Sequence, residues 1–455
     1  MLQAWVFSAA FLVAYVYLVS ADRFRGFAVW AAAAAACILC AVLGGAPDLL
    51  ALLRGIDIGI LMIFSGILLI AEVLVETKAP AWIAEKLVTV SGTLGRASLL
   101  LCLLSGAISM WVENVATVML LAPVALELAR RLEANPVPLL IGIAISSNLQ
   151  GTATLVGDPP SMILAAAEKL TFNDFFFMDG RLGIFFAVQC GAVASAFVLW
   201  RIFRRNRRVV AWHGATQVTS WVPVVIFVLT ILGLALASFS GSAGLPAGLP
   251  AGLLSGIICV VGGLVALVWH TLSHRGVLPP FLRSRVTDEE GSVRNSWQII
   301  KGFDLDTVLL LAGIFFMVGA LDTYGVIDWL GGLIADLSGG GALSAYLIIV
   351  AASMVISAFV DNVPFVTAML PVVHSVAIDM GLADWRFLSF GMLIGACLGG
   401  NISPIGASAN IVSISLLRKA GYTVSFREFV SIGLPFTLVA VTFGAAFVWF
   451  VWGPY

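Results

Sequence analysis

Charged side chains are scarce in this chain. Asp, Glu, Lys and Arg make up 11% of the 455 residues, against about 25% in soluble domains. Hydrophobic residues make up 61%, and the mean hydropathy is +1.06. This composition excludes a soluble protein and predicts an all-α polytopic membrane protein, with room for about ten spans of ~20 residues each.

Other features are also missing. The six cysteines all lie in apolar segments, which argues against a disulfide framework. The start of the chain has no early basic region or small-residue cleavage site, so residues 1–20 are predicted to form a first span. The cytoplasmic segments carry no nucleotide-binding motif, so any ATPase partner would be a separate chain. We expect no enzymatic activity, no cofactor, no metal site and no nucleic-acid partner.

Long apolar runs give the organisation of the chain. Two apolar regions, 97–129 and 342–380, are too long for one span and are predicted to be re-entrant helical hairpins. The stretch 79–92 is expected to be a short helix on the inner surface. Spans are predicted near 4–20, 27–45, 58–77, 137–168, 181–201, 221–239, 253–272, 306–322, 386–419 and 431–452.

The distribution of basic residues predicts an orientation. With the N-terminus outside, all but four of the 24 Lys and Arg fall on the inner side, and Arg25 lies in the first inner loop. A single crossing by 97–129 would move Arg130 and Arg131 outside, so the rule also favours the hairpins. The prediction is a multi-pass protein of the plasma (inner) membrane with both termini outside. The four exceptions are Arg54, Lys169, Arg181 and Arg386.

Two similar motifs stand at the middle of the predicted hairpins. Glu113-Asn114-Val115 and Asp361-Asn362-Val363 each place a carboxylate and an amide inside an apolar run. A carboxylate at membrane depth is costly, so a duplicated one favours a functional site between two related halves. The halves are predicted to be inverted repeats over 57–210 and 304–455, with scaffold spans in 1–56 and scaffold spans plus a cytoplasmic linker in 211–303.

Each half also contains an interrupted span. Residues 146–160 end in Gly157-Asp158-Pro159-Pro160, so one half-helix is predicted to end near Asn148 and another to begin near Pro159, with Asp158 as N-cap. Residues 399–410 repeat the pattern with four fewer residues between Asn and Gly. Broken helices expose backbone groups that can bind ions and small polar solutes.

The hairpin tips and broken helices are predicted to converge on one site. No Lys or Arg falls in this set, and its acidity suits a proton or a cation better than a dianion. Desolvation favours the protonated form of a carboxylate, so proton-coupled exchange is the expected mechanism. The candidate ion- and substrate-binding residues are Asn114, Asn148, Thr152, Asn362, Asn401 and Ser408, and the candidate proton-coupling residues are Glu113, Asp361 and Asp158.

Three longer pieces of sequence carry a family resemblance. These are Gly-Thr-Ala-Thr-Leu-Val-Gly-Asp-Pro-Pro (151–160), Asp-Asn-Val-Pro-Phe (361–365), and Gly-Ala-Cys-Leu-Gly-Gly-Asn (395–401) continuing to Gly-Ala-Ser-Ala-Asn (406–410). The chain resembles the superfamily of arsenite-efflux permeases, NhaD-type sodium/proton antiporters and the melanosomal P protein. The resemblance implies a homodimer, scaffold and transport domains, and elevator-like movement.

Several functions agree with these features. The first expectation is a secondary active transporter that exports arsenite or antimonite as the neutral hydroxide in exchange for protons. A Na⁺/H⁺ antiporter is the main alternative, followed by an anion conductance of P-protein type and Na⁺-coupled anion uptake. Cys102 and Cys397 are possible soft ligands for arsenic, but buried cysteine is usually packing. His374 is expected to be an interior residue whose hydrogen bonds are satisfied, in preference to a proton relay.

Overall fold

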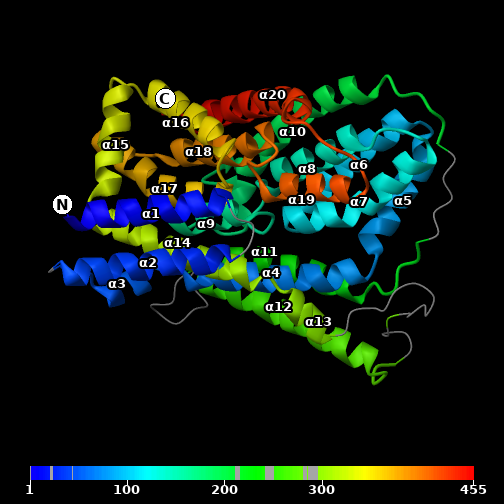
Figure 1. The fold of residues 1–455 in the computed structure, drawn as a ribbon, viewed down its shortest axis with the longest axis horizontal. Helices are drawn as coiled ribbons and strands as arrows, with labels where there is room; N and C mark the ends of the chain where they lie inside the picture. The colour runs from blue at the N-terminus through cyan, green and yellow to red at the C-terminus, as the bar shows by residue number, and fades with distance from the viewer. Residues whose placement is uncertain are drawn as a thin grey trace.

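The computed structural model describes residues 2–20, 24–43, 45–210, 216–240, 251–279, 284 and 296–454. The described part is almost entirely helical, and its only sheet is a two-stranded antiparallel ribbon of β1 (Phe177–Met178) and β2 (Arg181–Leu182). Residues 280–283 and 285–295 of the predicted cytoplasmic linker lie outside the described residues. The described chain begins and ends at the same end of the molecule (Figure 1).

The helices form two layers, with the first lying along the lower side of Figure 1. Helix α4 packs extensively on α12 and α2 packs on α14, so these helices and their neighbours are here named the scaffold layer. Its members are α1 (Leu2–Ser20), α2 (Arg25–Val42), α3 (Leu49–Arg54), α4 (Ile58–Glu76), α11 (Val222–Ser240), α12 (Ala251–His274), α13 (Ser296–Gly302) and α14 (Leu305–Thr323).

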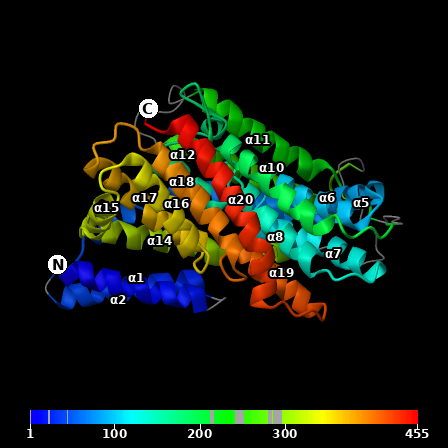
Figure 2. The same ribbon diagram turned by 90° about the horizontal axis from the view of Figure 1, so that it is seen from above.

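The remaining elements are named the hairpin layer. Helix α20 lies diagonally between α10 and α18 and packs on both (Figure 2). The layer comprises α5 (Ala79–Ser91), α6 (Leu94–Ser109), α7 (Asn114–Arg131), α8 (Val137–Gly151), α9 (Pro159–Ala167), η1 (Asn173–Phe175), the ribbon, α10 (Ile184–Phe203), α15 (Val326–Leu337), α16 (Ala342–Ser357), α17 (Asn362–Asp379), α18 (Arg386–Gly399), η4 (Gly400–Ile402), α19 (Ser408–Lys419) and α20 (Phe426–Trp452).

The two predicted hairpins are helix pairs joined by four-residue turns. Residues 110–113 join α6 to α7, and residues 358–361 join α16 to α17. In Figure 1, α6 and α7 extend toward one end of the molecule and α16 and α17 toward the other. Both predicted interruptions are also present, between α8 and α9 and between α18 and α19. Eight helices of the described chain are long and apolar enough to cross a membrane.

Three local expectations need correction. The Thr171-x-x-Asp174 spacing of a capping box predicts a helix start ahead of α10. The Asp174 carboxylate instead accepts hydrogen bonds from Thr171, and the chain forms the ribbon before α10 begins. Helix α15 was not predicted, although it lies across the other helices at one end of the molecule as α5 does at the other (Figure 1). Arg25 was expected in the first inner loop. It is the first residue of α2, and its side chain lines the central cavity.

Glycines allow α4 and α12 to approach each other closely. A Cβ atom added to Gly66 would lie 2.2 Å from the carbonyl carbon of Cys259, and one added to Gly263 would lie 2.9 Å from the carbonyl oxygen of Gly66. In membranes, small residues at helix interfaces allow the backbone contact that replaces a hydrophobic driving force. The scaffold layer therefore depends on the absence of side chains at this crossing.

Replacing Gly66 with Ala should destabilise the scaffold layer. The new methyl group meets backbone, which cannot rotate away, and overpacking of this kind costs about 1–3 kcal/mol. We expect a lower midpoint of thermal unfolding for the detergent-purified protein. Gly319→Ala in α14 is the control, because its Cβ would meet only Leu52 at 4.0 Å. Equal midpoints for the two variants would contradict the close α4–α12 contact.

Candidate functional site

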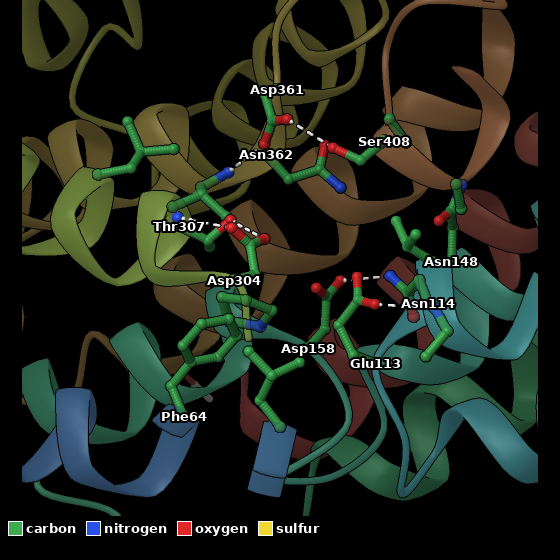
Figure 3. A pocket seen from close by; sticks show the side chains of 18 of the residues that line it. Phe64, Glu113, Asn114, Asn148, Asp158, Asp304, Thr307, Asp361, Asn362 and Ser408 are labelled. Atoms are coloured by element: carbon green, nitrogen blue, oxygen red, sulfur yellow. Dashed lines mark hydrogen bonds between the residues drawn. The ribbon is translucent and has the colours of Figure 1, made fainter. Parts of the chain in front are cut away.

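A cavity of about 200 Å³ lies between the two layers (Figure 3). The scaffold layer contributes side chains from α2, α4 and the start of α14. The hairpin layer contributes both hairpin tips and the starts of α9 and α19. Its polar and charged lining residues are Arg25, Glu72, Glu113, Asn114, Asn148, Asp158, Asp304, Thr307, Asp361, Asn362 and Ser408.

The two tip carboxylates occupy equivalent places. Glu113 is the N-cap of α7, and its Oε2 accepts a hydrogen bond from the Ala116 N–H at 3.0 Å. Asp361 is the N-cap of α17, and its Oδ1 accepts from the Val363 N–H at 3.2 Å. Capping satisfies backbone donors at each helix start. Both carboxylates nevertheless line the cavity, so they cap and face a ligand space at the same time.

The two tip asparagines are held by the same contact. Ser109 Oγ donates to Asn114 Oδ1 at 2.6 Å, and Ser357 Oγ donates to Asn362 Oδ1 at 2.6 Å. Each serine is the last residue of the first helix of its hairpin. This cross-turn bond fixes the orientation of each amide, and both asparagines line the cavity.

The broken helices meet through their asparagines. Asn148 Nδ2 donates to Asn401 Oδ1 at 2.8 Å and to Asn410 Oδ1 at 3.0 Å, and Asn401 Nδ2 donates to the Ile145 carbonyl at 3.2 Å. Asn148 lines the cavity, whereas Asn401 lies behind it. Thr152 is also fully buried away from the cavity, where its hydroxyl donates to the Asn148 carbonyl. Asn401 and Thr152 are therefore placed to support the site without lining it.

Asp158 differs from its predicted role. It precedes α9 in the N-cap position, but its side chain makes no capping hydrogen bond. Its Oδ2 instead accepts from Asn114 Nδ2 at 3.0 Å, which connects the first hairpin tip to the first broken helix (Figure 3). The corresponding residue in the second half is Ala407, with φ −148° and ψ 145° against φ −148° and ψ 141° for Asp158. The backbone is repeated, and the carboxylate is present in one half only.

Four charged or polar lining residues were absent from the predicted site. Asp304 caps α14 by accepting from the Thr307 N–H at 3.0 Å, and Glu72 comes from α4. Arg25 Nη1 lies 3.5 Å from Asp361 Oδ2. An acid-x-x-Thr helix start marked Asp304 in the sequence, but no sequence signal shows that a loop arginine turns inward. The site contains a cation that the sequence prediction excluded.

The electrostatics of the cavity are dominated by acids. Five carboxylates and one guanidinium line it. Helices α7, α9, α17 and α19 all begin at the cavity, and a helix N-terminus carries about half a positive charge, which stabilises nearby carboxylates in their ionised form. Within the described chain no three Asp, Glu, His or Cys side chains are grouped closely enough to hold one metal ion.

One buried atom facing this space has no partner among the described residues. Asn148 is 1% exposed, and its Oδ1 accepts no hydrogen bond. An orphaned buried acceptor costs about 1–3 kcal/mol. Because Asn148 lines the cavity, a bound cation or a donor on a solute would satisfy this oxygen.

The candidate soft ligands lie elsewhere. Cys397 is fully buried in α18, and Cys102 lines a separate small pocket with Gly106 and Gln150. Neither sulfur lines the central cavity. Any arsenic species held there would therefore be bound through oxygen.

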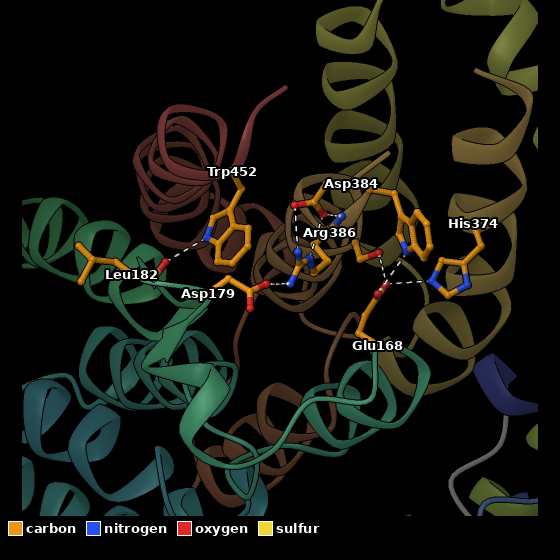
Figure 4. A network of polar contacts seen from close by, with 9 residues as sticks. Glu168, Asp179, Leu182, His374, Asp384, Arg386 and Trp452 are labelled. Carbon is orange, nitrogen blue, oxygen red and sulfur yellow. Dashed lines mark hydrogen bonds and ion pairs between the residues drawn. The ribbon is translucent and has the colours of Figure 1, made fainter. Parts of the chain in front are cut away.

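His374 belongs to a second polar network (Figure 4). Its Nε2 lies 2.8 Å from Glu168 Oε1, and the Glu168 carboxylate also accepts from the Ser389 hydroxyl and from Trp385 Nε1. Beside it, Arg386 pairs with Asp384 and with Asp179. The network joins the end of α9 to α17 and α18 and does not line the cavity, so His374 is satisfied by a neighbouring carboxylate.

Known proteins match this chain over most of its length. A sequence model of the CitMHS family, described as citrate transporter, matches residues 15–395 and 257–453. An uncharacterized transporter of Mycobacterium tuberculosis is 31% identical over 445 residues, which cover 96% of each chain. The P protein of Sus scrofa is 26% identical over 503 residues, which cover 98% of this chain and 59% of the P protein.

Two solved membrane transporters share the fold. The YdaH transporter of Alcanivorax borkumensis superposes with a TM-score of 0.55 at 14% identity, covering 90% of this chain and 88% of YdaH. MtrF of Neisseria gonorrhoeae, described as one of a class of antimetabolite efflux pumps, gives 0.50 at 13% identity, with 85% and 80% covered. At these identities the likeness shows the fold alone. The apolar helices and the match to a transporter family show that this chain is an integral multi-pass membrane protein.

Proposed function

Because the chain belongs to the citrate transporter family, we propose that it is a secondary active carrier that exchanges protons for a small cation by alternating access. The observation that carries this proposal is the acid-rich cavity between the two layers. Glu113 and Asp361 bring a carboxylate to it from each hairpin tip, and Asp158 adds a third from a broken helix.

Proton and cation would compete for the same oxygens. An ionised carboxylate binds a cation through its negatively charged oxygens. A protonated carboxyl group is neutral and binds the cation much more weakly. Amide and hydroxyl oxygens of Asn148, Asn362 and Ser408 complete a ligand set of hard oxygens, which suits Na⁺ or a similar ion. A transport site must also bind its ion weakly enough to release it.

Alternating access would follow from movement of the hairpin layer against the scaffold layer, because the cavity lies where the two meet. We propose an elevator-like displacement of this kind in a homodimer of the plasma membrane. The cavity is smaller than the roughly 300–1,000 Å³ typical of pockets for drug-sized ligands. A free polyanion would meet five carboxylates against one guanidinium, so the geometry favours a cation over citrate itself.

Arsenite or antimonite efflux, as found among the arsenite-efflux permeases, is the second candidate. A neutral trihydroxide carries donors for the orphaned Asn148 Oδ1 and for the carboxylates, and it is small enough for the cavity. It would be bound without cysteine. The P-protein relationship keeps an anion conductance among the outcomes of the test.

The test is flux in proteoliposomes under an imposed pH gradient, with Na⁺, arsenite and citrate offered separately. Saturable collapse of the gradient by Na⁺ alone supports the cation–proton exchanger. A response to arsenite alone would transfer the proposal to the neutral hydroxide. Citrate uptake, or anion current that does not saturate, would overturn both.

A further inference from the structure

Among the described residues, Arg25 is the one basic side chain that lines the cavity, and its backbone is fixed to α14. The N–H groups of Arg25 and Gly26 donate to the two carboxylate oxygens of Asp306 in α14, at 2.9 and 3.0 Å. A Cβ atom on Gly26 would lie 2.5 Å from the Asp306 carbonyl oxygen, so α2 begins in direct contact with α14. The start of α2 is therefore anchored, while the guanidinium extends into the cavity.

The guanidinium reaches across to the other layer. Its Nη1 lies 3.5 Å from Asp361 Oδ2, and Ser408 Oγ donates to the same oxygen at 3.1 Å. The side chains are 18% and 25% exposed, so this is a half-buried ion pair inside the cavity and not a surface contact. The pair connects the scaffold layer to the tip of the second hairpin.

The first hairpin tip has no equivalent cation among the described residues. Glu113 lines the same cavity, and its carboxylate accepts a hydrogen bond from the Ala116 N–H that it caps. The remaining charges that face the space are Glu72, Asp158 and Asp304, all acidic. Of the two hairpin-tip carboxylates, Asp361 alone lies beside a covalently attached cation within the described chain. That cation sits where a transported cation would approach the carboxylate.

From this geometry we infer that Arg25 is a specificity-determining residue. In the empty carrier its guanidinium pairs with the Asp361 carboxylate, and the transported cation must displace it from that carboxylate. The inference rests on the proposed cation–proton exchange. It sets two properties of the site. The displacement lowers the apparent affinity for the cation, and the ion pair holds the empty hairpin layer against the scaffold layer.

The test compares Na⁺ dependence in Arg25→Gln, Arg25→Lys and wild type, using Na⁺-driven proton flux in proteoliposomes. Arg25→Gln removes the competitor, so half-saturation should fall to a lower Na⁺ concentration by on the order of tenfold, the change for loss of one close charge pair. Arg25→Lys keeps a cation and should remain close to wild type. Arg54→Gln, an exposed arginine in α3 that does not line the cavity, is the matched control for loss of one charge.

Other results would overturn the inference. Unchanged half-saturation in Arg25→Gln means that the Arg25–Asp361 pair only holds the two layers together and does not compete with Na⁺. A weakened Na⁺ response in a folded variant means that Arg25 assists substrate binding. Na⁺-dependent thermal stabilisation in detergent measures the same shift for a variant that folds but does not transport. If wild type itself shows no Na⁺ response, the proposed function fails first, and that result is distinct from an unaltered Arg25→Gln.

Discussion

Glu113→Gln is expected to remove most of the proton coupling. Gln keeps an oxygen that can still cap α7 at Ala116, so the hairpin turn should form while the exchangeable charge is lost. A hydrogen bond to a charged group is worth about 1.5–3 kcal/mol, so the apparent affinity for the cation should fall by about tenfold or more. The measurement is Na⁺-dependent proton flux across the pH range.

The sign of the pH effect follows from competition. As pH falls, protons occupy more of the cavity carboxylates, and wild type should need more cation for half-saturation. Glu113→Gln should show a shallower dependence because one competing group is gone. Glu127→Gln on the same helix is the control: Arg130 and Arg131 lower the pKa of Glu127 to about 2, so its charge does not change in this range. Unaltered coupling in Glu113→Gln would remove Glu113 from the mechanism.

Asn401→Leu should abolish transport although Asn401 does not line the cavity. The substitution removes one of the two acceptors of Asn148 Nδ2 and the side-chain donor to the Ile145 carbonyl, both fully enclosed. Each buried group left without a partner costs about 1–3 kcal/mol. Asn148 Nδ2 would keep only its hydrogen bond to Asn410 Oδ1, and the two broken helices would lose a direct connection. Transport rate and thermal midpoint should both fall.

The control for Asn401→Leu is a substitution at a buried polar residue whose hydrogen bond stays within its own helix. It tests whether loss of any buried polar group would impair transport. Ser195 is fully buried in α10, and its hydroxyl donates to the Ala192 carbonyl of the same helix. Ser195→Ala should therefore leave transport near wild type. If Asn401→Leu behaves in the same way, the Asn148–Asn401 contact is dispensable, and the broken helices are positioned by backbone packing alone.

The helix pairs and the broken helices were predictable because their sequence signals are local. A carboxylate at the middle of an apolar run of more than 30 residues requires a turn there, and Glu113 and Asp361 are the caps that make those turns. Gly and Pro between 151 and 160 interrupt a helix by their own backbone preferences. Seven of the nine predicted site residues line one cavity for this reason, and their roles in binding and coupling stay predictions.

What was missed depends on contacts between distant segments. Arg25 was counted as a basic loop residue, but charge counting concerns the side of the membrane and not the direction of a side chain. Its pairing with Asp361 joins positions more than 300 residues apart. Asp158 was expected to cap α9, and the Asn114 amide competes for it from the hairpin tip. Helix α15 follows α14 with only Tyr324 and Gly325 between them, and its residues lie between the predicted span 306–322 and the predicted hairpin 342–380, where no element was assigned.

The first half has a carboxylate at Asp158, and the equivalent position in the second half is Ala407, which has none. This difference affects the relative free energies of the two states of the carrier. In a carrier built from inverted halves, the two facing states are reached by exchanging the conformations of those halves. Identical halves would make the two states equal in free energy, and a carboxylate in one half alone makes them unequal. The empty carrier should then rest toward one face of the membrane, and half-saturation measured from the two faces should differ.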